Sequence, residues 1–295
     1  MTSLRDAIEN RIHHLTGRTL GGVDYTQPKG DPGLFGPDTV AWKVHGEFTP
    51  MMCGGVSALL LQMLHPLALA GIWDHSNFRQ DMIGRLRRTS QFIAVTTFGS
   101  RDDAERILER VRRVHDGVSG HAADGTPYAA NDPDLLVWVH VAEMSRFLAA
   151  HMRYRNPRLS LADQDRYFDE TARVSEALGA RQVPRSRAAI DAYLEHQRRH
   201  LVCDTRTRDV IDVLLHAVPP SPVIRPAGAL FMRAGIDLLP PWAATLLSLE
   251  MSTLERRAVR GGILAIAPVM RWAVRNGSYR RALERMQVRE QAQRR

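Results

Sequence analysis

The chain of 295 residues is 44% hydrophobic and 24% charged, a balance that is typical of a globular protein and excludes a wholly disordered or collagen-like chain. Its formal net charge of +8 is compatible with nucleic acid or an anionic membrane as a partner. Only Lys29 and Lys43 are lysines, however, and all other basic residues except histidine are arginines, which indicates a compositional bias rather than a phosphate-binding surface. We therefore expect no nucleic-acid binding.

Residues 1–40 are predicted to form a short first helix and an extended arm, because glycine and proline are too dense between residues 21 and 39 for a regular element. The N-terminus lacks the apolar core of a secretory signal, and we expect a soluble, cytoplasmic protein. The main helical body is expected over residues 41–295 as one domain. The proline-rich segment 219–222 precedes a C-terminal lobe, from about residue 223, that we expect to pack back onto the body.

Helical periodicity and short breaks predict about ten helices and no strand of useful length. Ser100, Asp132 with Pro133, and Ser160 are expected to begin helices, and Gly99, Gly120 and Gly179 to end them. The fold class is therefore all-α, a single globular multi-helix domain. The predicted helices cover residues 51–71, 79–98, 101–119, 132–154, 160–179, 185–203, 206–217, 224–237, 240–258, 262–275 and 278–294.

The most apolar run, residues 56–72, contains Gln62, His65 and Pro66 and falls short of the ~20 apolar residues of a spanning helix. We expect a buried helix there and no transmembrane segment, which leaves peripheral membrane contact open. Cys53 and Cys203 are single and far apart in sequence, so they exclude a zinc ribbon, an iron–sulfur cluster and a disulfide scaffold. The oligomeric state is not determined by the sequence.

Two histidines occupy apolar helical stripes. His115 follows Leu108 and Val111 at helical spacing, and His140 lies between Leu136 and Phe147 on a comparable stripe. A neutral imidazole in such a place needs a partner, and both iron and a backbone carbonyl satisfy it. Spacing alone does not decide between a ligand and a core histidine.

Upstream, Arg85, Arg88 and Thr89 are spaced three and four residues apart and share one helical face. Two guanidiniums and a hydroxyl could pair with a carboxylate-bearing cofactor or orient dioxygen, although a solvated basic face has the same pattern. Just before them, His65, Asp74 and His75 fit either ligands and acid–base groups or a network of turn contacts.

Several other chemistries lack their sequence signatures. The Gly-x-Ser-x-Gly elbow, the phosphate-binding Gly-rich loop, His-Glu-x-x-His and Cys-x-x-Cys are all absent from the sequence. The pair His115-Asp116 resembles that of metal-dependent phosphohydrolases, but the supporting His and Asp have no matching contexts. This alternative is therefore minor.

Several short segments follow one another in a characteristic order, and they are weak motifs singly but fairly specific together. They are residues 42–47 (WKVHGE), 61–66 (LQMLHP), 84–89 (GRLRRT), 97–99 (TFG), 114–115 (VH), 128–133 (YAANDP) and 138–140 (WVH). Over about residues 34–215 this order resembles the bacterial DUF2236 proteins, which are grouped with the rubber oxygenase (latex-clearing protein) and the fungal MpaB oxygenase.

The resemblance implies a helical fold, globin-like in general packing, around one haem b whose iron is held by a helix histidine. His115 falls at the place of the family ligand, and His140 is the reserve. Arg85 and Thr89 match the segment on the opposite side, with the arginines as donors to oxygen or a haem propionate and Thr89 as a polar contact. Arg88 stands where the rubber enzyme has a lysine, and arginine essentially cannot ligate iron. Asp74 is the nearest residue to the family's base, without a secure match.

The activity implied by the resemblance is a haem-dependent oxygenase that cleaves a carbon–carbon double bond with O2. Because no export signal is expected, a small lipophilic, isoprenoid or unsaturated substrate is favoured over an extracellular polymer. A non-catalytic haem-binding sensor or carrier is the alternative. A third reading is an arginine-rich nucleic-acid binder.

Overall fold

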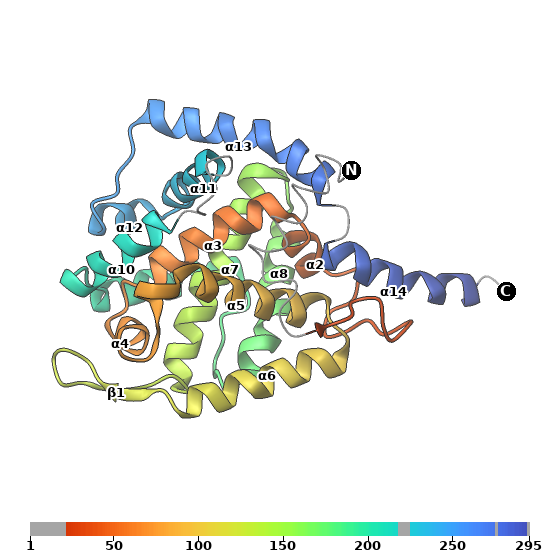
Figure 1. Ribbon diagram of the computed structural model, residues 1–295, viewed down its shortest axis with the longest axis horizontal. Helices are drawn as coiled ribbons and strands as arrows, with labels where there is room; N and C mark the ends of the chain where they lie inside the picture. Colours follow the sequence, from red (N-terminus) through yellow and green to blue (C-terminus); the bar gives the residue numbers. More distant parts are fainter. Residues whose placement is uncertain (1–21, 218–224, 275–276, 294–295) are drawn as a thin grey trace.

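The computed structural model describes residues 22–217, 225–274 and 277–293, and these residues form thirteen α-helices and one short β-hairpin (Figure 1). The all-α class expected from the sequence is confirmed. The predicted first helix falls on residues outside the described ranges. The helices are α2 (Val40–His45), α3 (Phe48–Gln62), α4 (Pro66–His75), α5 (Phe78–Phe98), α6 (Arg101–Asp116), α7 (Pro133–Tyr154), α8 (Leu161–Leu178), α9 (Arg187–Gln197), α10 (Thr205–His216), α11 (Arg225–Asp237), α12 (Pro241–Leu246), α13 (Thr253–Ala273) and α14 (Ser278–Gln293).

Helix α3 is the centre of the molecule, with α7 and α11 packed on it (Figure 1). Two glycines permit this close packing. A Cβ on Gly54 would lie 2.9 Å from the carbonyl oxygen of Arg146 and 3.0 Å from the Cα of Phe147, both in α7. A Cβ on Gly235 of α11 would collide with the side chain of Val56 in α3. The apolar run of α3 therefore meets neighbours on two sides, and most of its residues are buried.

The outer helices cover this centre. Helices α5 and α6 form an antiparallel pair joined by two residues, and α6 lies along one edge of the molecule while α13 lies along the opposite edge (Figure 1). Helix α13 packs on α11 and α3, and α14 follows it toward the C-terminus. The globin-like character of this packing stays a prediction.

The predicted helix starts have the expected capping contacts. Ser100, Asp132 and Ser160 each accept a hydrogen bond from a backbone N–H in the first turn of α6, α7 and α8. Gly179 ends α8 with φ = 115°, in the left-handed region that favours glycine. The capping signals in the sequence were therefore reliable for these helices.

Other boundaries were wrong. The helix predicted over residues 51–71 is two helices, α3 and α4, bent by 102° where Pro66 begins α4. The break predicted near Gly261 lies inside α13, and the chain breaks instead at residues 247–252. Gly99 does end α5 as expected, although its φ of −65° lies outside the left-handed region. Gly120 belongs to β1 (Ser119–His121), which pairs with β2 (Pro127–Ala129) in a hairpin that the sequence did not predict.

A membrane-spanning helix needs both length and an apolar sequence. Within the described ranges, no single helix is long and apolar enough to cross a bilayer. The bent pair of α3 and α4 passes that test only when its two helices are taken together.

Candidate functional site

A cavity of about 410 Å³ lies between α3, α5, α7, α11, α13 and the start of α14. This volume is in the range of small-molecule and cofactor sites. Most of its wall is apolar, and methionine is frequent there, a side chain that adapts to ligands of irregular shape. Apolar residues of the wall include Met51, Met52, Leu59, Ile93, Phe147, Phe231, Met232 and Met270.

Two carboxylates, Glu47 and Glu143, are among the described residues that line the cavity. Glu47 is neutralised by Arg155 at 2.6 Å and Arg271 at 3.2 Å. Within the described ranges Glu143 has no such ion pair, and its Oε1 accepts a longer hydrogen bond of 3.4 Å from Nε2 of Gln62. The two acids of the cavity thus differ in their electrostatic surroundings.

Burial raises the pKa of Glu143 to about 7, while the hydrogen bond from Gln62 and the positive charge of Arg85 act in the opposite direction. A carboxyl with this pKa exchanges its proton near neutral pH, which is the property of an efficient general acid or base. Glu143 is therefore a candidate acid–base group of this cavity.

The face predicted for Arg85, Arg88 and Thr89 is divided in the structure. Thr89 lines the cavity. Arg85 is half-buried close enough to Glu143 to influence its pKa, and burial lowers the pKa of Arg85 itself to about 10. The side chain of Arg88 is 60% exposed and pairs at 3.4 Å with Asp81, where the backbone of α5 is kinked. Arg85 and Thr89 are brought toward the cavity, and Arg88 is not.

His140 shares its helix face with the cavity wall. It precedes Glu143 by three residues and Phe147 by seven, so the three side chains follow one line along α7. His140 is 5% exposed, and its Nε2 is buried without a hydrogen-bond partner. Burial lowers its pKa to about 4, which keeps the imidazole neutral and its lone pair available at neutral pH.

His115 lies in the last turn of α6 and is not part of the cavity wall. Its Nδ1 is buried without a hydrogen-bond partner, and burial lowers its pKa, opposed by the charge of Asp116. Helices α5 and α6 run antiparallel, and at a rise of 1.5 Å per residue both Arg85 and His115 lie roughly 20 Å from the connection between them. Both residues therefore lie in the half of their helix that is remote from the connection.

His45 contacts the cavity, a position the sequence reasoning did not assign to it. Its Nδ1 lies 2.9 Å from Oγ1 of Thr97, and its Nε2 lies 2.9 Å from the hydroxyl of Tyr167. Burial lowers its pKa to about 3, with further contributions from His151 and His140. With both ring nitrogens engaged, His45 orders the cavity wall and is not free to bind iron.

The other candidates belong to a network outside the cavity wall. Asp74 accepts a 2.7 Å hydrogen bond from the hydroxyl of Tyr128, and His75 Nε2 lies 3.1 Å from the carbonyl oxygen of Ser119. These contacts attach the end of α4 to the β-hairpin. His65 also lies apart from the cavity, with its ring centre 5.6 Å from that of Trp138. Asp74 and His75 thus have the structural role that the sequence left open.

Glu143 is the main residue that sequence reasoning missed. A signal was present, because a glutamate three residues after His140 on a helix that is otherwise mostly apolar is an unusual burial of charge. The histidine on this stripe has the pattern of an iron ligand, whereas the carboxylate that follows it matches no motif. Gln62, its hydrogen-bond donor, was noted only as an interruption of an apolar run.

Comparison with known proteins supports an oxygenase relationship. Residues 42–276 match the family described as "ER-bound oxygenase mpaB/B'/Rubber oxygenase, catalytic domain". An uncharacterised protein of Mycobacterium bovis and one of Mycobacterium tuberculosis are each 28% identical over 190 residues, which cover 62% of this chain and 73% of each relative. No solved structure matches the chain. Since the family match extends over most of the sequence and contains nearly all of the cavity, the chain belongs to the MpaB and rubber oxygenase catalytic-domain family.

Proposed function

We propose that this chain is a haem b-dependent oxygenase that acts with O2 on a small lipophilic substrate of isoprenoid or unsaturated character. The observation that carries this proposal is the apolar cavity lined by Glu143, a half-buried carboxyl whose pKa is raised by burial to about 7, in a member of an oxygenase family. An apolar wall favours a lipophilic ligand, and the single near-neutral carboxyl gives the site one group able to move a proton.

Haem iron needs one protein ligand, and a histidine with a free, neutral ring nitrogen suits it. His115 and His140 both fit, because each has a buried ring nitrogen without a hydrogen-bond partner and a lowered pKa. We assign the axial ligand to His115, which holds the family position, and retain His140 as the second candidate because it shares a helix face with Glu143. Arg85 is the candidate donor to a haem propionate or to oxygen.

When bound, haem would supply the activation of O2. The chain itself contributes three things. The apolar wall excludes water from the substrate. The hydroxyl of Thr89, on the same wall, can donate or accept one hydrogen bond to a polar atom of the ligand. Glu143 can take a proton from the substrate or return one to a product oxygen, while Gln62 holds its Oε1.

The proposal is tested by the absorption spectrum of protein purified from haem-replete cells, together with His115→Ala, His140→Ala and the control His216→Ala. The side chain of His216 is 77% exposed, so its removal should leave a haem spectrum unchanged. We expect a Soret band in the wild type that His115→Ala loses. A colourless wild type that takes up no added haemin would refute the haem site. If only His140→Ala loses the band, the ligand assignment is wrong and the haem proposal stands.

A haem-binding sensor or carrier would pass the spectroscopic test as well. Oxygen consumption by the reduced haem protein with an alkene substrate, and carbonyl products derived from that alkene, separate the enzyme from a carrier. A red protein that consumes no oxygen with any of a panel of isoprenoid and unsaturated lipids would contradict the enzyme proposal and leave haem binding intact.

A further inference from the structure

Helix α13 has an unusual outer surface. Eight large hydrophobic side chains are exposed in the described part of the chain, and half of them lie on this one helix. Their exposed fractions are 77% for Leu254, 52% for Leu264, 52% for Val269 and 47% for Trp272. Scattered exposed hydrophobic residues need no explanation, but a concentration on one element marks an interaction surface.

The exposed residues form a face, and the opposite face is buried. Val259, Ile263 and Ala267, four residues apart, are buried where α13 packs on α11 and α3. Leu254 and Trp272 are eighteen residues apart, which is five full turns, so they lie on one line roughly 27 Å long. Figure 1 shows α13 at the edge of the molecule. The helix is therefore apolar both toward the core and away from it, unlike an ordinary surface helix.

This face lies in the most basic part of the chain. Seven arginines and no acidic residue occur between Glu255 and Glu284, and Glu255 is itself paired with Arg233 at 2.7 Å. At 100° per residue, Arg257, Arg260 and Arg271 flank the exposed apolar face on the side of Leu264. Arg260 is paired with Asp237 and Arg271 with Glu47, and Arg257 has no ion pair among the described residues. Arginines beside an apolar helix face are the arrangement that binds an interface between lipid headgroups and acyl chains.

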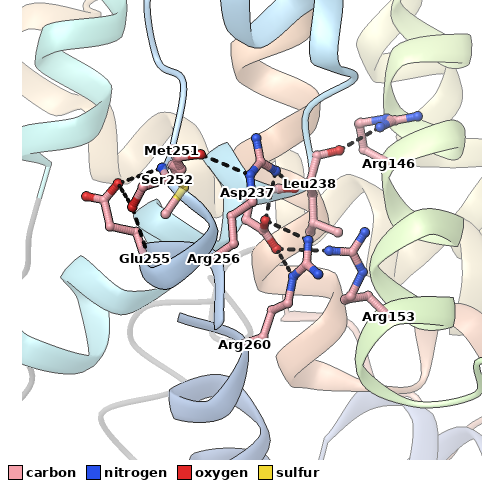
Figure 2. Close-up of polar contacts among 9 residues, drawn as sticks. All are labelled: Arg146, Arg153, Asp237, Leu238, Met251, Ser252, Glu255, Arg256 and Arg260. Carbon is pink, nitrogen blue, oxygen red and sulfur yellow. Dashed lines mark hydrogen bonds and ion pairs between the residues drawn. The ribbon is translucent and has the colours of Figure 1, made fainter. Parts of the chain in front are cut away.

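The cluster in Figure 2 adds to this charge. The carboxylate of Asp237 is fully buried and meets three guanidiniums, those of Arg153 at 2.9 Å, Arg256 at 3.0 Å and Arg260 at 2.7 Å. One negative charge cannot neutralise three positive ones. Each of these arginine side chains is about a third exposed, so the surplus charge reaches the solvent beside α13.

The C-terminal end of α13 is also part of the cavity wall. Ala267, Met270, Arg271 and Val274 line the cavity, and Arg271 is also exposed, at the C-terminal end of α13 beside Trp272. The cavity wall and the exposed apolar surface therefore share one end of α13.

We propose that α13 docks on the surface of a bilayer that contains anionic phospholipids, with its exposed apolar face at the boundary between headgroups and acyl chains. Its flanking arginines contact lipid phosphates, and Trp272 lies at the headgroup level, where tryptophan is enriched. A lipophilic molecule can then pass from the bilayer into the cavity without crossing water. This last step rests on the proposed function, whereas the docking itself does not.

A second copy of the chain is the less favoured occupant. Two copies that met through this face about a twofold axis would place the arginine flanks of both helices at the same interface, with no acidic residue on α13 after Glu255 to compensate them. An anionic bilayer supplies the missing negative charge. Charge complementarity therefore selects the lipid surface.

The test is sedimentation of the full chain with phosphatidylcholine vesicles that contain or lack phosphatidylserine. The variant is Leu264→Glu with Val269→Glu. Its control is Val114→Glu with Leu161→Glu, which places the same two charges at positions 59% and 62% exposed on α6 and α8. We expect the wild type and the control to bind the anionic vesicles, and the α13 variant to bind about tenfold more weakly or less. Unchanged circular dichroism spectra show that the variants fold.

Three results would overturn the docking proposal: no binding to either vesicle, equal loss in the control variant, or a wild-type dimer that the α13 variant dissociates while vesicle binding is unchanged. The last result would make this face a contact between copies. Vesicle binding needs neither haem nor turnover, so a failed spectroscopic test with intact vesicle binding refutes the proposed function alone. A haem spectrum as expected, together with no vesicle binding, refutes docking alone.

Discussion

At the scale of single residues, Glu143 sets the expected pH dependence of turnover. Burial raises the pKa of its carboxyl from 4.5 to about 7, so activity should change as that group titrates near neutral pH. Glu143→Gln removes the titration and should lower turnover about 10²- to 10⁴-fold. Glu47→Gln, at the other cavity acid, should keep the pH limb near 7. A Glu143→Gln enzyme with an unchanged pH–rate profile would exclude the acid–base role.

Arg85 and Arg88 provide a matched pair for the same profile. The charge of Arg85 lowers the pKa of Glu143, so Arg85→Gln should move the pH limb to higher pH. The exposed Arg88 pairs with Asp81 instead, and Arg88→Gln should leave the limb in place. The measurement is the pH dependence of kcat/KM for both variants. An equal displacement in both would mean that the arginines act through general surface charge.

For the residues near the cavity, the sequence predicts the helix face on which a side chain lies but not the neighbours it meets. Helical spacing correctly placed His140 and Phe147 on a buried stripe and placed Arg85 and Thr89 on one face of α5. Spacing gives the direction of a side chain around its helix axis but not the element that covers it. The kink of α5 at Asp81, which pairs with Arg88 away from the cavity, depends on contacts within the folded chain.

At the scale of helices, the crossing of α3 and α7 depends on Gly54. A Cβ there would meet backbone atoms of α7 at 2.9 and 3.0 Å, and backbone cannot give way as a flexible side chain can. Gly54→Ala should therefore lower the free energy of unfolding by about 1–3 kcal/mol. The adjacent Gly55 is its control, because a Cβ there meets only Phe147 Cε1 at 3.8 Å. Gly55→Ala should be neutral or stabilise by up to about 1 kcal/mol through helix propensity, measured by urea unfolding.

Ion pairs of Asp237 connect helices α7, α11 and α13. Removing a fully buried carboxylate leaves the guanidiniums of Arg153, Arg256 and Arg260 without their partner, and Asp237→Ala should cost about 3–5 kcal/mol. Asp169→Ala breaks the exposed pair with Arg185 and should cost at most about 1 kcal/mol. Similar losses in the two variants would show that Asp237 is not a structural centre.

The sequence predicts which segments are helical, but not every point at which one helix ends and the next begins. Local signals such as the capping Ser100 and Ser160 depend on neighbouring backbone and were read correctly. Gly261 and Gly262 form a pair that is typical of a helix end, yet they lie inside α13. Leu230 packs against Gly262 and leaves little room for a side chain there. A pattern search cannot distinguish a glycine that ends a helix from one that admits a neighbour.

At the scale of the whole molecule, several buried histidines make stability depend on pH. Burial lowers the pKa of His45 to about 3 and those of His65 and His140 to about 4, against 6.5 in the unfolded chain. Between these values the unfolded chain binds protons that the folded chain does not, so stability falls as pH falls from 6.5 toward 4. Glu143 has the opposite sign, because its raised pKa makes the folded chain bind its proton more tightly between pH 4.5 and 7.

The three histidines together change the free energy of unfolding with pH more than Glu143 does. From pH 7 to pH 5 the three histidines together cost about 5.5 kcal/mol and Glu143 returns about 2 kcal/mol, which leaves a net loss of about 3.5 kcal/mol. Urea unfolding at the two pH values measures it. His65→Leu, which is outside the proposed haem site, should reduce the loss by about 2 kcal/mol, and the exposed His216→Leu should not change it. Stability that is equal at pH 7 and pH 5 in the wild type would mean that these imidazoles are hydrated in solution, because their lowered pKa values arise chiefly from burial.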